Sequence, residues 1–265
     1  MDILKRNLSP ITDKAWQEID ETAAEILKNY LSARKFVDVN GPKGWDFSSI
    51  SVGRIKTEEK STKDGVYYGI KEVQPLIESR IQFDLDIWEL DNIERGAKDI
   101  DLEPLEEAAK KMALFEENAI YNGFEKANIT GLKNEAENTV KMSKDPEKAL
   151  DAISKGVSLF RDESIEGPYN LIVNPDVWQK IVKFTKGYPI KRQIENLIEG
   201  KIIYSQAIDN AYLVSNRGGD FELTVGHDFS IGYQKQSDKK VTLFITESFT
   251  YRSVDPNAAI RLEIE

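Results

Sequence analysis

The clearest pattern in the chain is an alternation of apolar and polar positions at 77–86, followed by apolar residues at helical spacing. Positions 77, 81, 83, 85 and 87 are apolar, whereas the even positions from 78 to 86 are polar or charged. This period of two predicts a strand with one buried face. After a turn expected at 91–96, the apolar positions between Leu105 and Ala119 predict a helix from about Asp101 to Gly123, roughly 30 Å long. Other elements must therefore pack along this helix.

The same criteria divide the remaining chain. A first helix is predicted from about Asp13 to Ala33, with Thr12 as its N-cap. A hairpin of two thin, charged strands with little apolar surface is predicted at 51–71. Because a two-stranded ribbon is only marginally stable in water, we expect another subunit to hold it. The other predicted elements are, in order, a polar loop at 128–144, a helix after Asp145, a strand at 169–173, helices after Asn174 and near Pro189, strands at 201–205 and 211–215, and two long strands that meet near Ser237. This mixture indicates an α+β protein.

Composition and charge narrow the function classes. The 265 residues carry a formal net charge of -10, which argues against a nucleic-acid-binding protein because such a protein needs a basic surface. The chain has no cysteine, so disulfides and thiolate chemistry are excluded, and the cytoplasm is favoured. The sequence lacks an apolar run that could span a bilayer or form the core of a signal peptide. We therefore expect a cytoplasmic protein that binds neither nucleic acid nor membranes.

Signatures of common enzyme families are absent from the sequence. It has no phosphate-binding loop, no dinucleotide-binding glycine pattern, no nucleophile elbow and no zinc-protease motif. The one histidine, His227, would have to be the base of any Ser-His-Asp arrangement, and a base needs a nucleophile within hydrogen-bond reach. A structural role is the simpler interpretation of His227, and a peptidase is the alternative.

The strand at 77–86 and the residues just after it offer two candidate binding features. Asp84 and Asp86 lie on one face, where they could ligate a hard cation, but their spacing does not match an EF-hand loop and a solvated acidic face is the alternative. Trp88 falls on the polar face if the alternation continues. Either the strand ends and leaves an exposed indole that can stack on a ligand or a partner subunit, or a bulge turns Trp88 into the core.

The first helix offers a further candidate site. Its apolar face is wider than one packing contact requires, and Arg34, Asp38 and the Gly41-Pro42 turn follow its end. This arrangement is typical of a groove that binds a short peptide, and an ordinary core helix is the alternative.

Six longer segments of the chain carry a family resemblance. They are LKRNLSPITDKAWQEID at 4–20, ARKFVDVNGPKGW at 33–45, FDLDIWELDNIERG at 83–96, IEGPYNLIVN at 165–174, SNRGGDFELTVGHDFSIGY at 215–233 and LFITESFTYRSVDP at 243–256. Through them the chain resembles, over nearly its whole length, the encapsulin shell proteins, once grouped with the linocin-type bacteriocins.

The resemblance implies the fold of tailed-bacteriophage major capsid proteins, the Hong Kong 97 type, assembled into a closed icosahedral shell. It implies a peripheral domain formed by 1–50, 72–145 and 220–265, an extended loop at 51–71 that reaches a neighbouring subunit, and an axial domain at 146–219. The implied function is a cytoplasmic nanocompartment without catalytic residues of its own. Its shell encloses a cargo enzyme, commonly a ferritin-like iron oxidase used for iron storage or a dye-decolourising peroxidase, which docks through a short C-terminal targeting peptide.

By position, the resemblance also implies functional residues. The peptide-docking groove would consist of Leu27, Tyr30, Leu31, Arg34, Asp38, Val39, Asp228, Ile231 and Tyr233, with apolar side chains binding the peptide and Arg34 and Asp38 fixing its direction. The fivefold pore would be lined by Thr185, Lys186, Gly187 and Tyr188. In some members a flavin (FMN or riboflavin) stacks on the tryptophan that matches Trp88, where Arg80 could approach its phosphate or ring edge. The resemblance implies no required cofactor and no metal.

Three rival interpretations stay open at this point. One is a peptidase that uses His227, and another is a flavin-dependent oxidoreductase centred on Trp88. The third is a prophage major capsid protein, because the fold is shared.

Overall fold

The computed structural model describes residues 2–57, 64–143, 145–183 and 189–265. The helices are α1 (Asp13–Tyr30), α2 (Ile87–Arg95), α3 (Glu103–Asn122), α4 (Leu132–Glu135), α5 (Pro146–Asp162), α6 (Pro175–Lys183) and α7 (Ile190–Ile198). The strands form two sheets and a ribbon. The four-stranded sheet has the order β1 (Asp38–Asn40), β9 (Phe221–Gln236), β10 (Lys240–Ser253) and β4 (Ile77–Asp86), and the ribbon consists of β2 (Ser49–Thr57) and β3 (Gly69–Pro75). The five-stranded sheet has the order β5 (Asn138–Met142), β11 (Ala259–Ile264), β8 (Ala211–Ser215), β6 (Tyr169–Val173) and β7 (Ile202–Tyr204).

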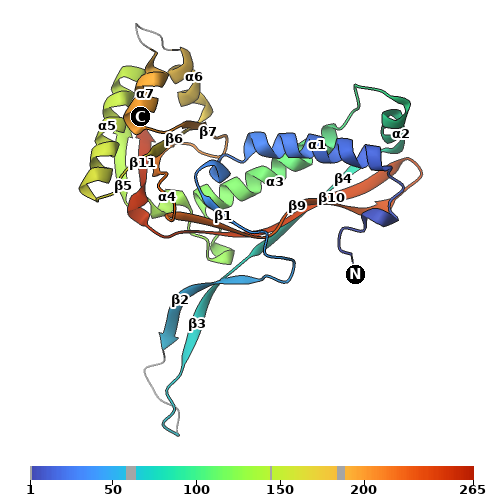
Figure 1. The fold of residues 1–265 in the computed structure, drawn as a ribbon, viewed down its shortest axis with the longest axis horizontal. Helices are drawn as coiled ribbons and strands as arrows, with labels where there is room; N and C mark the ends of the chain where they lie inside the picture. The colour runs from blue at the N-terminus through green and yellow to red at the C-terminus, as the bar shows by residue number, and fades with distance from the viewer. Residues whose placement is uncertain (1, 58–63, 144, 184–188) are drawn as a thin grey trace.

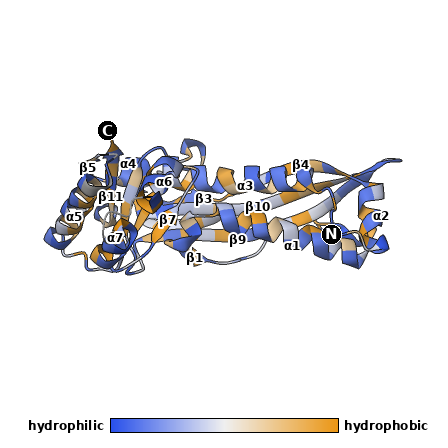
Figure 2. Cartoon of the chain, turned by 90° about the horizontal axis from the view of Figure 1, so that it is seen from above, coloured by the Kyte–Doolittle hydropathy of each residue, from blue (hydrophilic) through white to orange (hydrophobic). Residues whose placement is uncertain are grey.

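The molecule is elongated, and the ribbon projects from its middle (Figure 1). The five-stranded sheet and helices α5, α6 and α7 form one end, and α2 lies at the other end (Figure 2). Helices α1 and α3 run along the four-stranded sheet between these ends. This arrangement is the α+β architecture that the sequence predicts.

Local capping residues set the ends of the two long helices. The Thr12 hydroxyl accepts a hydrogen bond from the Ala15 N–H at 3.2 Å at the start of α1. The Asp101 carboxylate accepts one from the Glu103 N–H at 3.1 Å at the start of α3, and Gly123 ends α3 with a φ of 89°. The cap at Thr12 is the one that the sequence predicts, whereas the N-cap of α3 is Leu102 and the predicted cap, Asp101, lies one residue before it. Helix α1 ends at Tyr30, earlier than expected, and a 3₁₀ turn at Ala33–Lys35 follows it.

Helix α2 replaces the turn expected at 91–96. The strand β4 ends at Asp86, whose carboxylate accepts a hydrogen bond from the Trp88 N–H at 2.8 Å and so caps the helix. Gly96 ends α2 in the left-handed region with a φ of 88°. The prediction of a turn is wrong because these two caps enclose a nine-residue helix, Ile87–Arg95.

The segment at 128–144 is not a plain loop, as the sequence analysis expected. It contains α4 and β5, and β5 pairs in parallel with β11 near the end of the chain. Both strands come from segments assigned above to the peripheral domain, yet they belong to the five-stranded sheet. The division into domains stays a prediction, and this pairing favours placing β5 and β11 with the axial part.

Two buried hydrophobic clusters occupy the described residues. One lies between α1, α3 and the four-stranded sheet and includes Leu105 and Met112 of α3. The other extends into the five-stranded sheet and its helices and includes Ile120 and Tyr121 of α3. Helix α3 therefore passes from one core into the other.

The ribbon β2–β3 is the least covered part of the described chain. Every residue of β2 is at least partly exposed, and Tyr67, in the connection to β3, is 81% exposed. The prediction of little apolar surface is wrong. The exposed apolar residues of the two strands are Val52, Ile55, Ile70 and Val73, and those of the connection that precedes β3, counted here with the ribbon, are Val66, Tyr67 and Tyr68.

Candidate functional site: a groove beside helix α1

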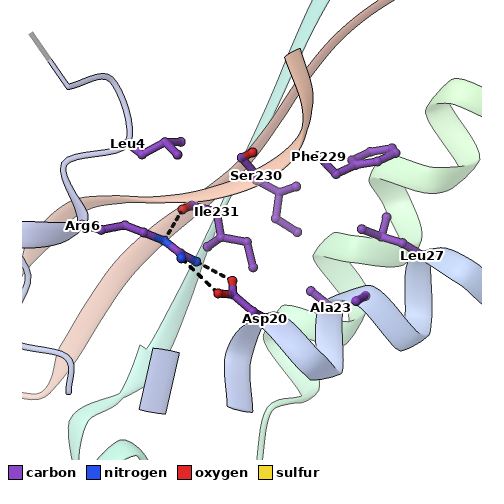
Figure 3. A pocket seen from close by; sticks show the side chains of 10 residues that line it. Leu4, Arg6, Asp20, Ala23, Leu27, Phe229, Ser230 and Ile231 are labelled. Atoms are coloured by element: carbon purple, nitrogen blue, oxygen red, sulfur yellow. Dashed lines mark hydrogen bonds and ion pairs between the residues drawn. The ribbon is translucent and has the colours of Figure 1, made fainter. Parts of the chain in front are cut away.

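A groove of about 330 Å³ lies between α1, β9 and the N-terminal segment (Figure 3). Its walls are mainly apolar, and it is partly open to solvent. The lining residues are Leu4, Arg6, Asp20, Ala23, Ala24, Leu27, Phe229, Ser230, Ile231 and Ile245. A concave apolar site with a few polar groups at its rim suits an apolar ligand segment with a defined orientation.

The N-terminal segment forms one wall because β9 holds it. The Tyr233 N–H donates to the Leu4 carbonyl at 2.8 Å, and the Arg6 Nε donates to the Ile231 carbonyl at 2.9 Å. Arg6 also forms a bidentate ion pair with Asp20 of α1, with one contact of 3.0 Å (Figure 3). This pair joins the segment to α1 and closes one end of the groove.

An irregularity in β9 shapes the opposite wall. The register between β9 and β10 shifts between Thr246 and Ser248, so that Asp228 and Phe229 have no direct partners on β10. The Asp228 carboxylate accepts a hydrogen bond from the Phe229 N–H at 2.9 Å and supports this bulge. Phe229 lies two residues before Ile231 and lines the groove together with it.

Arg34 lies in a buried ion network instead of on the open groove surface. Its Nη2 donates to Glu116 and to Glu247, both at 2.6 Å, and its Nη1 donates to Asp228 at 3.0 Å. Its guanidinium also lies 5.0 Å from the centre of the Phe229 ring. Burial and the neighbouring Glu116 raise the pKa of Glu247 well above its usual range. The network therefore joins the bulge of β9 to α3 and β10.

Glu117 belongs to a second buried network next to the first. Its carboxylate accepts hydrogen bonds from the Ala33 N–H at 2.8 Å and from the Ser32 hydroxyl. The Ser205 hydroxyl, just after β7, donates to it at 3.4 Å. Burial raises the pKa of Glu117 to about 7, although these hydrogen bonds oppose the shift.

The structure brings together only part of the predicted docking set. Leu27 and Ile231 line the groove, whereas Arg34 and Asp228 pair with each other outside its lining. Tyr233 holds the N-terminal segment through its backbone.

The other predicted docking residues lie outside the groove lining. Leu31 is buried, and Tyr30 is half-buried with the Lys110 ammonium 5.3 Å from its ring centre. Asp38 accepts a hydrogen bond from the Gly219 N–H at 2.5 Å on β1, and Val39 beside it is 46% exposed.

The sequence analysis missed most of the groove lining. The residues it did not name are Leu4, Arg6, Asp20, Ala23, Ala24, Phe229, Ser230 and Ile245. Ala23 and Asp20 could have been found, because they lie one and two helical turns before Leu27 on the same face of α1.

The structure keeps the predicted flavin residues apart. Trp88 is 67% exposed in the first turn of α2, and Arg95 lies 5.5 Å from its ring centre. Arg80 lies 4.2 Å from the centre of the Phe244 ring and pairs with Glu78 at 3.6 Å. Of the two alternatives for Trp88, the exposed indole after the end of the strand is the correct one. A flavin site formed by Arg80 and Trp88 together is not supported.

The acidic strand face and the histidine have other partners. Asp84 accepts a hydrogen bond from the Thr242 hydroxyl at 2.6 Å, and Asp86 caps α2. Within the described ranges no cluster of three or more metal-ligating side chains occurs. The His227 ring stacks on Trp45 with the ring centres 3.5 Å apart, and burial lowers its pKa. The Ser248 hydroxyl accepts the His227 backbone N–H and not a ring N–H.

Thr185, Lys186, Gly187 and Tyr188 lie outside the described residues, so the pore assignment stays a prediction. In the part of the chain that the structure describes, no helix is long and apolar enough to cross a bilayer.

The fold is shared with virus-like particles and phage capsids. A virus-like particle from Pyrococcus furiosus matches with a TM-score of 0.68 and 22% sequence identity, covering 93% of this chain and 98% of that chain. The Mycobacterium phage Bobi structure matches with a TM-score of 0.58 and 13% identity, covering 89% of this chain and 91% of that one. The elongated body and projecting ribbon are thus those of the Hong Kong 97 type of capsid protein.

Sequence comparison identifies the family within this fold. The family model described as "Encapsulating protein for peroxidase" matches residues 1–250. The type 1 encapsulin shell protein of Rhodospirillum rubrum is 40% identical over 270 residues, covering 99% of this chain and 96% of the relative. That of Mycobacterium tuberculosis is 36% identical over 264 residues, covering 99% of each chain. The chain belongs to the type 1 encapsulin shell protein family, whose members are named for a structural and not a catalytic role.

Proposed function

We propose that this chain assembles with copies of itself into a closed icosahedral shell that encloses a cargo enzyme. The observation that carries the proposal is the projecting ribbon, whose apolar side chains are exposed in the single subunit. Ile70 is 62% exposed and Ile55 is 59% exposed, and a second copy of the chain would cover them. A closed shell needs such contacts between different surfaces of neighbouring subunits. The full-length similarity to shell proteins supports the same conclusion.

The groove beside α1 is the proposed docking site for a cargo peptide. Its apolar walls, including Leu27, Phe229 and Ile231, would bind apolar side chains of an extended segment. The Arg6–Asp20 pair, which belongs to the lining of the groove, would fix the direction of the peptide. The cargo classes to test are a dye-decolourising peroxidase and a ferritin-like iron oxidase, each with its C-terminal targeting peptide.

Assembly is tested by electron microscopy of the purified full-length protein, together with its mass by light scattering. Uniform hollow particles are the expected result. A monomer or small oligomer at high protein concentration would contradict the shell proposal, whatever the state of the groove.

Docking is tested by co-expressing the shell protein with a dye-decolourising peroxidase, with and without the C-terminal segment of the peroxidase. Leu27→Asp places a charge in the apolar groove and should abolish co-purification of the peroxidase while particles still form. Lys28→Asp is the matched control, because Lys28 is the adjacent, exposed residue of α1. Equal loading of Leu27→Asp and the control would overturn the groove assignment. The same pair is run with a ferritin-like cargo.

A further inference from the structure

A buried polar seam crosses the middle of the subunit where its two hydrophobic cores meet. Helix α3 contributes Met112 to one core and Ile120 to the other, and Glu116 and Glu117 lie between them. The seam is defined here by six residues, Ser32, Arg34, Glu116, Glu117, Asp228 and Glu247. It joins α3 to the 3₁₀ turn at Ala33–Lys35 and to both long strands of the four-stranded sheet.

Within the seam, Glu116 and Glu247 form a carboxyl pair on one arginine. The same Arg34 Nη2 lies 2.6 Å from an oxygen of each side chain, and neither side chain has any exposed surface. The second oxygen of Glu247, Oε2, is buried and has no hydrogen-bond partner. A buried carboxylate oxygen that no donor reaches is costly to keep ionised, and a proton on the carboxyl group removes that cost.

The charge balance of the seam also indicates that a buried carboxyl group keeps its proton. Its titratable groups are four carboxyl groups, from Glu116, Glu117, Asp228 and Glu247, and one guanidinium, from Arg34. Full ionisation would leave three more negative than positive charges, and of the four carboxylates only Asp228 is substantially exposed, at 48% of its side chain. Burying uncompensated charge is costly, and a buried carboxyl group avoids that cost by keeping its proton.

We propose that Glu247 keeps its proton beside Glu116 and Arg34, and that opening of the seam releases this proton, so that the two cores separate more readily as the pH rises. The groups that face the pair are Arg34 from the 3₁₀ turn, Glu117 from α3 and Asp228 from β9. Only Arg34 among them opposes the negative charge. The proposal is independent of cargo docking, since it concerns the stability of the subunit and none of the six seam residues lines the groove.

The direction of the pH dependence follows from linkage. In the closed seam the pair keeps a proton that an open or unfolded chain gives up above the ordinary carboxyl range. The stabilising effect is therefore complete at low pH and is lost progressively as the pH rises toward the raised pKa of Glu247. Protection of the seam should fall about tenfold for each pH unit in this window.

The retained proton is detected by infrared spectroscopy of the purified full-length protein. The carbonyl stretch of a protonated carboxylic acid is expected at about pH 6.5, above the range in which ordinary carboxyl groups titrate. Glu117→Gln combined with Glu135→Gln should retain the band, which excludes the other two glutamates of raised pKa. Adding Glu247→Gln should remove it. Absence of the band at this pH from the protein without substitutions would overturn the proposal, and this measurement needs no variant to fold.

The consequence for opening is measured by hydrogen exchange of the same protein, after correction for the intrinsic pH dependence of exchange. Amides of α3 near Glu116 and of β10 near Glu247 should lose about tenfold protection per pH unit above the ordinary carboxyl range, as the pH rises toward the raised pKa of Glu247. Strands β6 and β8 serve as the internal control, because they lie in the other sheet. Glu247→Gln should weaken the dependence at the seam only. If amide protection at the seam depended equally on pH in the protein with and without Glu247→Gln, the proposed release of a proton from Glu247 would be contradicted.

Discussion

The hairpin β9–β10 and the ribbon β2–β3 are both long antiparallel strand pairs, and different interactions stabilise them. In β10, every residue from Val241 to Tyr251 is buried, because β9 and β4 flank it and α1 and α3 cover one face of the sheet. The ribbon β2–β3 has no such cover, and Gln74 is the one buried residue of its two strands. Alternating sequence therefore predicts where strands form, whereas the stability of a strand pair depends on what covers it.

The ribbon is attached to the body at its root only. The Gln74 side-chain amide donates to the Tyr251 carbonyl at 2.7 Å and to the Thr250 hydroxyl at 3.1 Å. Arg252 donates to the Ser51 carbonyl at 3.3 Å on the same side. These contacts direct the ribbon away from the body, so its apolar side chains are available to a neighbouring subunit.

The largest expected effect comes from charging the ribbon. Tyr67→Asp with Ile70→Asp should abolish particle formation, because the buried interface would then contain two unpaired charges, while the subunit keeps its secondary structure. Light scattering and circular dichroism measure the two properties. Thr57→Asp with Lys71→Gln changes the net charge of the ribbon equally at polar positions and should still allow assembly. Particles of normal size from the apolar pair would show that the ribbon is not an interface.

Truncating a buried side chain in the covered strand pair β9–β10 should destabilise the subunit itself. Leu243 is fully buried in β10, and Leu243→Ala should lower the free energy of unfolding by about 4 kcal/mol through lost contacts and a cavity. Ile55→Ala in the ribbon should cost under about 0.5 kcal/mol in the non-assembling background described above. Denaturant unfolding compares the two. Similar losses in both variants would remove the distinction between the strand pairs.

The pH dependence of stability should also differ between the body of the subunit and the ribbon. Burial raises the pKa of Glu117 to about 7 from an ordinary 4.5, so the folded protein holds a proton that the unfolded chain loses in this range. The resulting stabilisation is complete below the ordinary pKa and falls by about 3 kcal/mol as the pH rises to about 7. Glu117→Gln should flatten this part of the stability profile in urea unfolding. The ribbon residue Glu72, replaced by Gln, is the control and should leave the slope unchanged.

The smallest expected effect concerns the root of the ribbon. Gln74→Ala leaves the Tyr251 carbonyl without this donor and should cost about 1 kcal/mol. Hydrogen exchange should show faster exchange near Ser51 and Gln74 and no change in β10 near Leu243. Faster exchange throughout β10 would mean that the ribbon contributes to the stability of the sheet beneath it.

Much of the fold could be predicted from local sequence signals. Thr12 caps α1 as expected, Asp101 lies one residue before the N-cap of α3, and the two long final strands are β9 and β10. The strand β5 was missed because its pairing partner, β11, lies more than a hundred residues later and nothing local marks it. Helix α2 was missed because its polar sequence also suits a turn.

The groove was predictable only where its residues follow regular periods. Leu27 and Ile231 lie on the expected faces of a helix and a strand. Phe229 follows from the same alternation, two residues before Ile231, and was missed, whereas Arg6 reaches the groove through the path of the N-terminal segment, which does not follow from spacing. Arg34 was expected to contact a ligand directly, but its neighbours are the carboxylates of the seam. Tertiary contacts thus decided the environments of these charged side chains.

The path of the N-terminal segment determines what a label at either end of the chain can report. The segment is bonded to β9 through Leu4 and Arg6 and forms a wall of the groove, whereas the C-terminus follows β11 in the five-stranded sheet at the far end of the body (Figure 1). A fluorophore near Asp2 would sense a ligand entering the groove through a change in its surroundings. The same fluorophore at Glu265 would serve as a reference that is insensitive to groove occupancy.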